Sequence, residues 1–515
     1  MKLKRSSLSC LSLFLAIFIF SSGPAAIAQD APLQGLDEYV NRSIRDWDVP
    51  GVAIAVIKDD KIIFAKGFGV RETGKPEPVD ARTMFAIGSS SKAFTAASLA
   101  MLVDEGKIKW DDPATKYLPG FQLFDPYATR EMTVRDLLTH RVGLERGDQI
   151  WYATPYSREE VMRRIRFLPP SSSFRSKFGY QNIMYLAAGE IVPSVTGKSW
   201  DDFVRERIFV PLGMNETNTS ISRLTGMADV AAPHQKIDDK VIAIPYRLID
   251  NIGPAGSINS NVTEMSQWVR LQLGKGTYEG KQLIKPDTVA EMQSPQTIIR
   301  LEGQMKTMYP EAHFLSYGMG WFLSDFRGRK MVEHGGAIDG MRALVAMIPE
   351  ENIGAVILTN RGGTILPQPL AYRIFDALLG VKDQRDWSGD MLKSMKALEG
   401  QAAAAAAKLE ANRVKGTSPS LPLERYAGDY QSDMYGDVKI SLENGKLMAR
   451  FGPYFTGQLE HWHYDVFRVT WQDKTEGKSF ISFRLDQQGK VAEMNMSGLG
   501  DLKRVPEKKA DAAKQ

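Results

Sequence analysis

The feature that most constrains the fold of this chain is a pair of β-rich segments that lie far apart in the sequence. Residues 51–67 contain two runs rich in valine, isoleucine and alanine around a short Asp59-Asp60 turn, and they predict a hairpin. Residues 343–358 contain two similar runs around a turn-prone Pro-Glu-Glu-Asn segment and predict a second hairpin. Helix formers dominate between them, as at 94–103. This order predicts one α+β domain whose sheet is assembled from distant parts of the chain.

The composition changes after Trp387. Six consecutive alanines stand among charged residues within 391–414, and they predict a solvated helix that serves as a connector. The following Lys-Gly-Thr-Ser-Pro-Ser-Leu-Pro stretch at 415–422 predicts a loop. The predicted division is a signal peptide at 1–28, a main domain at 29–387, a helical linker at 388–420, a small β domain at 421–508 and a disordered tail at 509–515.

The small C-terminal domain carries the strongest hairpin signal in the chain. Residues 438–451 contain two runs joined by Asn444-Gly445, and this dipeptide supplies the positive φ angles of a type I′ turn. Residues 480–485 and 491–496 add further alternating strands. The last part of the chain therefore predicts an antiparallel β domain.

The N-terminus has the features of a cleavable signal peptide. Lys2, Lys4 and Arg5 precede an apolar run at 8–20, which is followed by Ala-Ile-Ala at 26–28. The apolar run is shorter than the roughly 20 residues that span a bilayer. We expect a periplasmic or secreted protein with no stable membrane insertion after cleavage.

The composition of the mature chain excludes several classes of function. Cys10 is the only cysteine and lies within the predicted signal peptide, so cysteine catalysis, disulfides and sulfur-ligated metals are excluded. Loss of three cations with the signal peptide lowers the formal net charge from +4 to +1, which does not favour nucleic acid as a partner. The six histidines show no ligand spacing on a shared helix, so we expect neither a metal nor a cofactor.

The first candidate for chemistry is a serine followed three residues later by a lysine. Gly88 and Ser89 lie at the start of a predicted helix, and Lys92 lies on the same helix face as Ser89. A serine hydroxyl needs a nearby base, and a lysine serves when burial or neighbouring positive charge lowers its pKa. The amide groups at a helix start also favour developing negative charge. Alone, the pair has a plain alternative, which is a helix cap with a solvated lysine.

Two further segments add candidates. In the first, Tyr180 supplies a phenol that can relay a proton, and Asn182 supplies an amide that can hold a substrate. A core aromatic is the plain alternative for Tyr180. In the second, a strand-like run contains His334, Gly335 and Gly336, and the two glycines let a ligand approach the backbone closely. A structural role is the alternative for His334.

The three motifs together resemble the serine β-lactamase and penicillin-binding protein superfamily, most closely the class C β-lactamase-like esterases and peptidases. Further matching segments are Asp111-Asp112-Pro113, Leu137-Leu-Thr-His140, Pro211-Leu-Gly-Met214, Tyr317-Gly-Met-Gly-Trp321 and Leu358-Thr-Asn360. This resemblance covers about residues 33–387. The C-terminal part, with Tyr426-Ala-Gly-Asp-Tyr430, resembles the lipocalin-like domain that is often appended to such enzymes.

The resemblance implies a fold and a set of roles. The fold is an antiparallel sheet flanked by helices, with a helical subdomain and a C-terminal barrel-like β domain. The implied catalytic residues are Ser89 as nucleophile and Lys92 with Tyr180 as proton carriers, with the backbone amides of Ser89 and Ala337 as oxyanion donors. An acyl-enzyme forms, and water hydrolyses it. The implied substrate-binding residues are Asn182, His334, Gly335 and Gly336.

One departure from the family bears on the substrate. β-Lactamases and cell-wall carboxypeptidases carry Lys-Thr-Gly or a close variant at the third motif, where the cation holds a substrate carboxylate. Here the residue is His334, which with an ordinary pKa near 6.5 is largely neutral at pH 7. The sequence therefore favours a serine hydrolase of small peptides, including D-residue or unusual peptides, ahead of carboxylic esters. A β-lactamase or D,D-carboxypeptidase and then a non-catalytic peptide sensor are the further alternatives, and the oligomeric state stays open.

Overall fold

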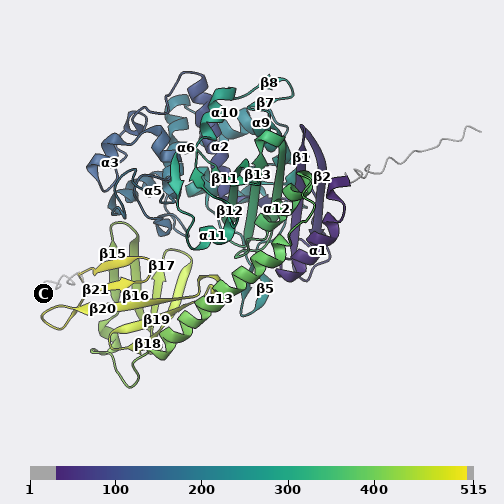
Figure 1. Cartoon of the computed structure of the whole chain (residues 1–515). Coiled ribbons are helices and arrows are strands. Elements are labelled where there is room, and N and C mark those ends of the chain that lie inside the picture. The colour runs from purple at the N-terminus through teal and green to yellow at the C-terminus, as the bar shows by residue number, and fades with distance from the viewer. Residues whose placement is uncertain (1–30, 507–515) are drawn as a thin grey trace, which may run out of the picture.

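A computed structural model describes residues 31–506, and an eight-stranded antiparallel sheet forms the centre of the main domain (Figure 1). The predicted signal peptide at 1–28 and the predicted tail at 509–515 lie outside the described residues. The strand order is β2-β1-β14-β13-β12-β11-β10-β9. These strands are β1 (Gly51–Lys58), β2 (Lys61–Gly69), β9 (Thr297–Ile299), β10 (Leu315–Tyr317), β11 (Phe322–Phe326), β12 (Arg329–Ile338), β13 (Met341–Ile348) and β14 (Ile353–Thr359).

Both hairpins expected in this sheet are present. β1 and β2 flank the Asp59-Asp60 turn, where both residues have positive φ, and β13 and β14 flank the turn at 349–352. β1 pairs with β14 from Val52↔Thr359 to Lys58↔Ile353. The first strand of the domain therefore lies beside the last, which confirms an α+β fold with a sheet built from distant parts of the chain. Three two-stranded sheets accompany it: β3 (Phe85–Ala86) with β6 (Asn259–Ser260), β4 (His234–Ile237) with β5 (Lys240–Ala243), and β7 (Thr277–Tyr278) with β8 (Lys281–Gln282).

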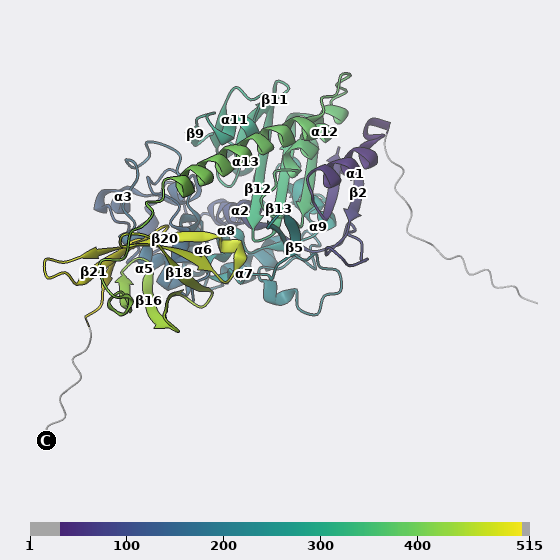
Figure 2. The same ribbon diagram turned by 90° about the horizontal axis from the view of Figure 1, so that it is seen from below.

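Helices cover both faces of the sheet (Figure 2). On one side lie α1 (Leu36–Asp46), α12 (Pro367–Leu378) and α13 (Trp387–Ala411), and on the other lie α2 (Ser91–Asp104) and α9 (Val262–Leu273). Every residue of α2 from Ser91 to Leu102 is buried, which explains why its sequence lacks a polar face. The remaining helices are α3 (Pro126–Glu131), α4 (Val134–Leu138), α5 (Arg158–Arg164), α6 (Asn182–Thr196), α7 (Trp200–Val204), α8 (Gly253–Gly256), α10 (Pro286–Met292) and α11 (Gln304–Met308).

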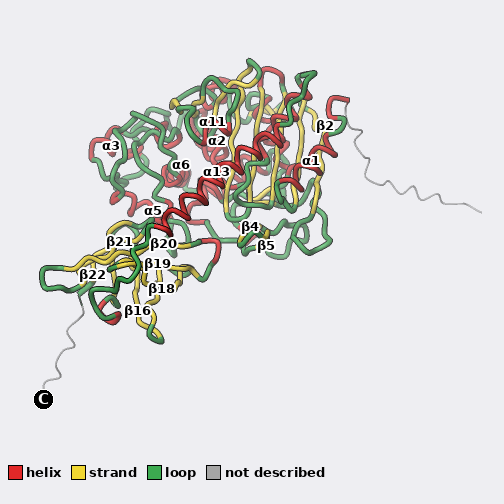
Figure 3. Tube along the Cα trace, turned by 60° about the horizontal axis from the view of Figure 1, so that its bottom comes forward, coloured by secondary structure: helices red, strands yellow, loops and turns green. Residues whose placement is uncertain are grey.

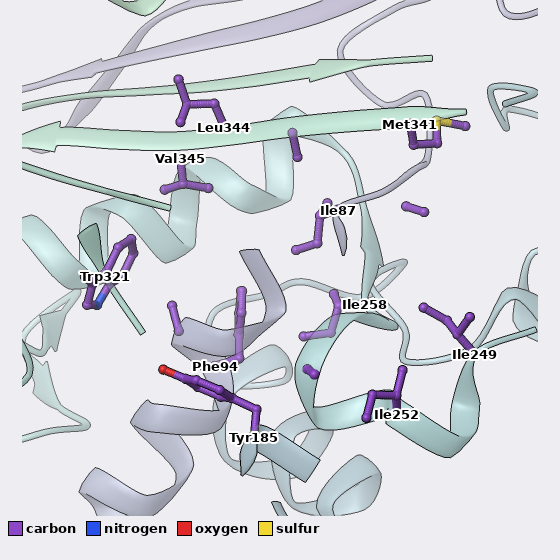
Figure 4. Packing of buried hydrophobic residues seen from close by; sticks show 14 of the residues in the cluster. Ile87, Phe94, Tyr185, Ile249, Ile252, Ile258, Trp321, Met341, Leu344 and Val345 are labelled. Atoms are coloured by element: carbon purple, nitrogen blue, oxygen red, sulfur yellow. The ribbon is translucent and has the colours of Figure 1, made fainter. Parts of the chain in front are cut away.

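The core fixes the segment that leads into α2. Ile87 is fully buried, its amide donates to the Ile258 carbonyl at 2.9 Å, and its side chain lies between β13 and Phe94 (Figure 4). Leu344 and Val345 point to opposite faces of β13 in the same view, as successive strand residues do. Only Val345 faces α2. The start of this helix has no side-chain cap, and it is held by the contacts of Ile87 with β13 and with Ile258.

The C-terminal part is a closed eight-stranded antiparallel barrel, as expected for the appended domain. Its last strand returns to its first through the pair Tyr430↔Arg504. Asn444 and Gly445 have φ of 50° and 74°, which are the positive values that the sequence predicted for this turn. The strands are β15 (Gly428–Ser432), β16 (Gly436–Glu443), β17 (Lys446–Phe451), β18 (Phe455–His463), β19 (Val466–Trp471), β20 (Lys478–Leu485), β21 (Val491–Met496) and β22 (Gly500–Arg504).

The long helix α13 leads from the sheet domain to the barrel (Figure 3). The barrel also contacts the sheet domain through Arg247, whose guanidinium reaches Asp339 on its own domain and Asp473 and Glu476 on the barrel at 2.9–3.1 Å. Asp339 follows directly after β12. The barrel is thus tied to the end of the strand that carries the third motif. Within residues 31–506 no helix is long and apolar enough to cross a membrane.

Candidate active site

Ser89 lies on a single 3-10 turn, Gly88–Ser90, that leads into α2. Gly88 has a φ of 51°, and a Cβ at this position would lie 2.7 Å from the backbone nitrogen of Ala337. Only glycine therefore allows the turn to approach β12 this closely. This approach brings the backbones of the two predicted oxyanion donors, Ser89 and Ala337, close together at the edge of the same cavities.

Lys92 lies one turn into the helix, and its Nζ is 3.0 Å from Ser89 Oγ. Its two other contacts are the Asn182 Oδ1 at 2.8 Å and the Ala255 carbonyl oxygen at 2.7 Å. Both are oxygens that can only accept. A neutral amine has two hydrogens and one lone pair, so when both hydrogens go to these oxygens the lone pair is left for the Ser89 hydroxyl.

The electrostatics favour this neutral form. Lys92 is fully buried, and burial lowers its pKa well below 10.5, with a further lowering from the positive charge of Arg146. Asp148 acts in the opposite direction but does not reverse the shift. Lys92 is therefore placed and tuned to take the proton of Ser89.

Asp148 fixes the orientation of the Asn182 amide. The Asn182 Nδ2 donates to the Asp148 carboxylate at 2.8 Å, which can only accept, so the oxygen end of the amide must face Lys92. Asp148 also accepts from Arg146 at 2.6 Å and from the Trp151 indole at 2.9 Å. Both ends of the Asn182 amide are thus engaged within the protein, and its predicted contact with a substrate stays a prediction.

Tyr180 lies across the site from α2. Its ring packs on His140 at a tilt of 33° with centroids 4.2 Å apart, and the Lys92 Nζ is 4.9 Å from its ring centre. Burial raises the pKa of Tyr180 above its ordinary value of 10, and a hydrogen bond with Ser89 opposes this rise only in part. The phenol keeps its proton at neutral pH. The opposite pKa shifts of Lys92 and Tyr180 are consistent with the predicted roles of base and acid.

The His140 ring packs against the ring of Tyr180. Its Nδ1 accepts from the Gln181 amide at 3.1 Å, so Nε2 carries the hydrogen. Burial lowers its pKa well below 6.5 and keeps the ring neutral. Among the described residues its Nε2 has no hydrogen-bond partner, and the ring acts as a packing surface for Tyr180, Tyr185 and Tyr317.

His334 lies inside the protein on β12, 1% exposed. Its Nδ1 is 2.6 Å from the Gly335 carbonyl, and its Nε2 is 2.9 Å from the Tyr317 hydroxyl. A carbonyl only accepts, so Nδ1 carries the hydrogen and Nε2 accepts from Tyr317. Burial lowers the pKa of His334 to about 3. The position at which the family carries a cation therefore holds a neutral ring with both nitrogens in use.

The two glycines of the third motif differ in what they contact. A Cβ on Gly336 would lie 1.8 Å from the Ile87 carbonyl oxygen, so this glycine is required by the protein's own turn before Ser89. A Cβ on Gly335 would meet nothing closer than 3.5 Å. β11 pairs with β12 only as far as Glu333, so the backbone from His334 to Ile338 has no β11 neighbour. Gly335 therefore has free space on its Cβ side, whereas Gly336 does not.

Two cavities meet at Ser89. The first, here called the Trp151 lobe, has a volume of about 380 Å³ and is lined by Trp151, Tyr152, Asp148 and Asp339 among others. The second, here called the Met308 lobe, has a volume of about 320 Å³. Its lining is mainly apolar and includes Met305, Met308, Phe178, Phe322, Leu344 and Ile365. Both lobes are bordered by Ser89, Ala337, Arg146 and Arg342. The nucleophile therefore lies between two compartments of different character.

Sequence reasoning missed three contributors. Asp148 orients Asn182, Ala255 binds Lys92 through a backbone carbonyl, and Arg342 borders both lobes. No local pattern marks the first two, because each acts through a contact between distant segments. Arg342 lies five residues after Ala337 across a tight hairpin, so its cross-strand position could have been inferred. Within residues 31–506 no group of three or more histidine or acidic side chains could hold a metal.

The chain matches two families of known proteins. Residues 36–379 match the Beta-lactamase family, and residues 412–511 match the Domain of unknown function (DUF3471). The Unguisins hydrolase ungD of Aspergillus violaceofuscus (strain CBS 115571) is 30% identical over 489 residues, which are 87% of this chain and 85% of that protein. Protein flp of Staphylococcus aureus (strain NCTC 8325 / PS 47) is 22% identical over 342 residues, 65% of this chain and 64% of that protein.

Solved structures share the fold. The octameric penicillin-binding protein homologue from Pyrococcus abyssi superposes with a TM-score of 0.60 at 21% identity, covering 91% of this chain and 98% of that one. A D-stereospecific amidohydrolase from Streptomyces sp. gives a TM-score of 0.53 at 21% identity, covering 67% of this chain and 97% of that one.

Proposed function

This chain belongs to the β-lactamase family of serine hydrolases, and we propose that it is an exported enzyme that forms an acyl-enzyme on Ser89 and cleaves amide bonds in small peptides. The observation that carries this proposal is the set of contacts around Lys92. A buried amine that gives both hydrogens to fixed acceptors and its lone pair to a serine has a chemical use but no structural one.

The reaction follows from these positions. Ser89 Oγ attacks the substrate carbonyl carbon as its proton moves to Lys92 Nζ, and the amides of Ser89 and Ala337 stabilise the negative oxygen. The proton then passes through Tyr180 to the leaving nitrogen, and the bond from the carbonyl carbon to nitrogen breaks. Water then attacks the resulting ester and gives a proton to Lys92, and Lys92 returns this proton to Ser89 Oγ as the bond between the carbonyl carbon and Oγ breaks and the acid is released.

An amide is favoured over an ester because of Tyr180. An amine leaves only when it gains a proton, whereas most alkoxides and phenoxides leave more easily. A protonated phenol beside Lys92 can pass a proton to the leaving nitrogen while it takes one from Lys92. The similarity to a protein named as an Unguisins hydrolase is consistent with hydrolysis, and the fold shared with a D-stereospecific amidohydrolase is a reason to include D-residues among the substrates tested.

A carboxylesterase is the second candidate. The same acyl-enzyme serves esters, and the apolar Met308 lobe can accept an alkyl or aryl group. Hydrolysis of β-lactams ranks lower, because His334 supplies no positive charge at the third motif. A non-catalytic peptide sensor ranks last, since binding alone has no need of a tuned Lys92.

The test is a comparison of the wild type with Ser89→Ala. Both proteins are incubated with a mixed library of peptides containing L- and D-residues and with a set of alkyl and aryl esters, and the products are identified by mass spectrometry. Cleavage of peptides by the wild type alone is expected. Cleavage of esters alone would show that the protein is an esterase and not a peptidase. Binding of substrates without cleavage by either protein would show that it is a sensor and not an enzyme.

Export is tested separately. Expression of the full chain with its N-terminus in a Gram-negative host is expected to give a periplasmic protein that begins after Ala28. A cytoplasmic protein that retains residues 1–28 would contradict this part of the proposal.

A further inference from the structure

Glu333 lies on β12, directly before His334, and takes no part in the chemistry described above. It is 2% exposed, and it lines the Met308 lobe but not the Trp151 lobe. Successive strand residues point to opposite faces of a sheet, so the Glu333 carboxyl and the His334 ring lie on different faces of β12. The Met308 lobe therefore extends from the nucleophile Ser89 to a buried acid that the reaction does not use.

The carboxyl group of Glu333 has neutral partners. Its Oε1 accepts from the Tyr309 hydroxyl at 2.6 Å, and its Oε2 accepts from the Gln368 amide at 2.9 Å. Burial raises the pKa of Glu333, and these two hydrogen bonds lower it only in part. No cation among residues 31–506 pairs with this carboxyl group to hold its pKa down. The acid therefore lacks a counter-charge.

Two other buried acids of the sheet domain do have one. Asp136 and Asp376 are both 0% exposed, and each accepts from an arginine, at 2.6 Å and 2.8 Å. Buried acids are generally paired in this way because an unpaired buried charge is costly to stability. A glutamine at position 333 would accept the Tyr309 hydrogen bond equally well without a charge to desolvate. A purely structural role therefore has no need of an acid here.

The charged groups of the Met308 lobe are separated along its length. Arg146 and Arg342 border both lobes, so they lie where the lobes meet, beside Ser89. Glu333 lies four residues before Ala337 on β12, which is roughly 13 Å along the strand. The lining of the lobe is mainly apolar. A ligand group with an apolar stem and a cationic tip fits this arrangement, because the stem contacts the walls while the tip reaches the acid away from the arginines.

We propose that Glu333 is a substrate-binding residue that takes a primary ammonium group, so that the preferred substrates carry an amine on an apolar stem, as the side chain of lysine does. This inference rests on the proposed function and names its substrate class. Each oxygen of an ionised carboxyl group has a lone-pair site beyond the one hydrogen bond that it already accepts. An ammonium placed there supplies the missing counter-charge and favours the ionised acid.

The amine can belong to the acyl part or to the leaving group, and two pairs of amides separate these sources. The first pair is the 4-nitroanilides of 6-aminohexanoic acid and of heptanoic acid. The second pair is N-(6-aminohexyl)butanamide and N-heptylbutanamide. Within each pair an ammonium replaces a methyl group of similar size. For each pair, kcat/KM of the cationic amide is divided by that of the neutral amide, in the wild type and in Glu333→Gln.

Glu333→Gln is expected to lower the ratio of one pair by roughly 10- to 100-fold, since a charged hydrogen-bonded contact is lost. The pair that changes identifies the side on which the amine lies. The variant keeps the size of the side chain and an acceptor for Tyr309, and the Gln368 amide can turn its oxygen toward the new amide nitrogen. Glu333→Asp is expected to give an intermediate ratio, because the charge stays but lies farther from the lobe.

Glu264→Gln is the matched control. Glu264 is 7% exposed and accepts from the backbone amides of Glu216 and Thr217 at 2.9 Å and 2.8 Å, but it lines neither lobe. The same loss of a buried acid there is expected to change both ratios by less than about threefold. An equal fall in the two variants would mean that the loss of an acid acts through the fold and not through the lobe, and it would overturn the proposal.

Unchanged ratios in Glu333→Gln for both pairs would also overturn it. Titration of the unmodified protein and of Glu333→Gln with hexylammonium and with hexan-1-ol, followed by the NMR signals of the Met305 and Met308 methyl groups, needs no turnover. If neither protein hydrolyses any amide or ester, the proposed function fails. Tighter binding of hexylammonium than of hexan-1-ol that disappears in Glu333→Gln would still support the ammonium site, and equal binding would exclude it.

Discussion

The sheet domain and the barrel differ in what they bury. The sheet domain encloses Lys92, His334 and Glu333 together with many hydroxyl and amide side chains. Among the described residues of the barrel, 428–504, no polar or charged side chain other than tyrosine and tryptophan is fully buried. Its interior is filled by contacting rings such as Tyr426, Phe467 and Phe483. Fully buried polar side chains are thus concentrated in the sheet domain, and the barrel's exception is the Arg468 Nε, which is buried without a partner.

The barrel contacts the sheet domain near the candidate site through its rim rather than its interior. Asp473 and Glu476 hold Arg247, and Arg247 holds Asp339, two residues beyond Ala337. A groove that is lined by Tyr180 and Arg146 on the sheet domain continues to Tyr435 and Gly498 of the barrel. The comparison predicts that replacing a buried polar side chain of the sheet domain lowers activity and leaves stability equal or higher. Changes inside the barrel should affect stability alone.

The largest effect is expected for Lys92→Met. Loss of the base should lower kcat/KM by roughly 10²- to 10⁴-fold, and removal of a buried amine should leave the thermal midpoint equal or higher. Enzyme kinetics and thermal unfolding of the two proteins measure both quantities. A variant that is inactive because it is unfolded would break the comparison, since Lys92 would then be a structural residue.

The stability gain of this variant should depend on pH. The pKa of Lys92 is lowered in the fold, so between the folded and unfolded values the unfolded chain holds a proton that the folded chain lacks. Wild-type stability therefore rises with pH across that window, and the advantage of Lys92→Met is expected to be larger at pH 7 than at pH 10. An advantage that does not vary with pH would mean that burial of a neutral amine is not its source.

The second effect concerns the contact between the two domains. Arg247→Gln leaves Asp339, Asp473 and Glu476 without their cation, and we expect a loss of about 3 kcal/mol in unfolding free energy and a few-fold loss in kcat/KM. Urea unfolding and hydrogen exchange at 339 and 473–476 measure it. Arg484→Gln is the matched control, because Arg484 also faces two carboxylates but is 55% exposed, and a change below about 0.5 kcal/mol is expected. Equal effects of the two variants would show that the rim contact has no special role.

A smaller effect is expected on the pH dependence of stability below pH 6.5, where His334 is the residue concerned. The pKa of His334 is about 3 in the fold, below its ordinary 6.5, so between these values only the unfolded chain binds the proton. Stability falls as pH falls through this window, by about 1.4 kcal/mol per pH unit for each such histidine. His334→Gln should remove one histidine's share of that slope, which urea unfolding at pH 6, 5 and 4 measures. An unchanged slope would place the ring outside the buried network with Tyr317.

Features that depend on neighbouring residues were predictable from the sequence. The turns at Asp59-Asp60 and Asn444-Gly445 each follow from local backbone preference, and both form as expected. The spacing of Ser89 and Lys92 likewise needs only the geometry of one helical turn, and their side chains do meet. Local rules were sufficient for these because no distant segment competes with them.

Features that depend on distant segments were not predictable. The sequence expected Gly336 to make room for a ligand, which stays a prediction, but it could not show that this glycine also makes room for the Ile87 carbonyl, some 250 residues earlier in the chain. Arg342 could be placed beside Ala337 by a hairpin argument, but its lack of a partner depends on where every nearby carboxylate goes. Only the folded structure shows that Asp148, Asp339 and Glu333 are already engaged.

The smallest effects are expected for glycine substitutions at two exposed positions, one in the β16–β17 turn and one in α13. They test whether backbone strain there changes stability without changing activity. Gly445→Ala forces a side chain into a φ of 74° at the β16–β17 turn, and although nothing lies within 4 Å of the new Cβ, a loss of about 1 kcal/mol is expected. Gly400→Ala in α13 also meets nothing within 4 Å but has no positive φ, so a gain of roughly 0.5–1 kcal/mol is expected from lower chain entropy. Thermal unfolding should give the two opposite signs, and kcat/KM should stay unchanged in both. A fall in kcat/KM for Gly445→Ala would mean that the barrel acts on the cleft from its far end as well as through Arg247, which would weaken the division between the two domains.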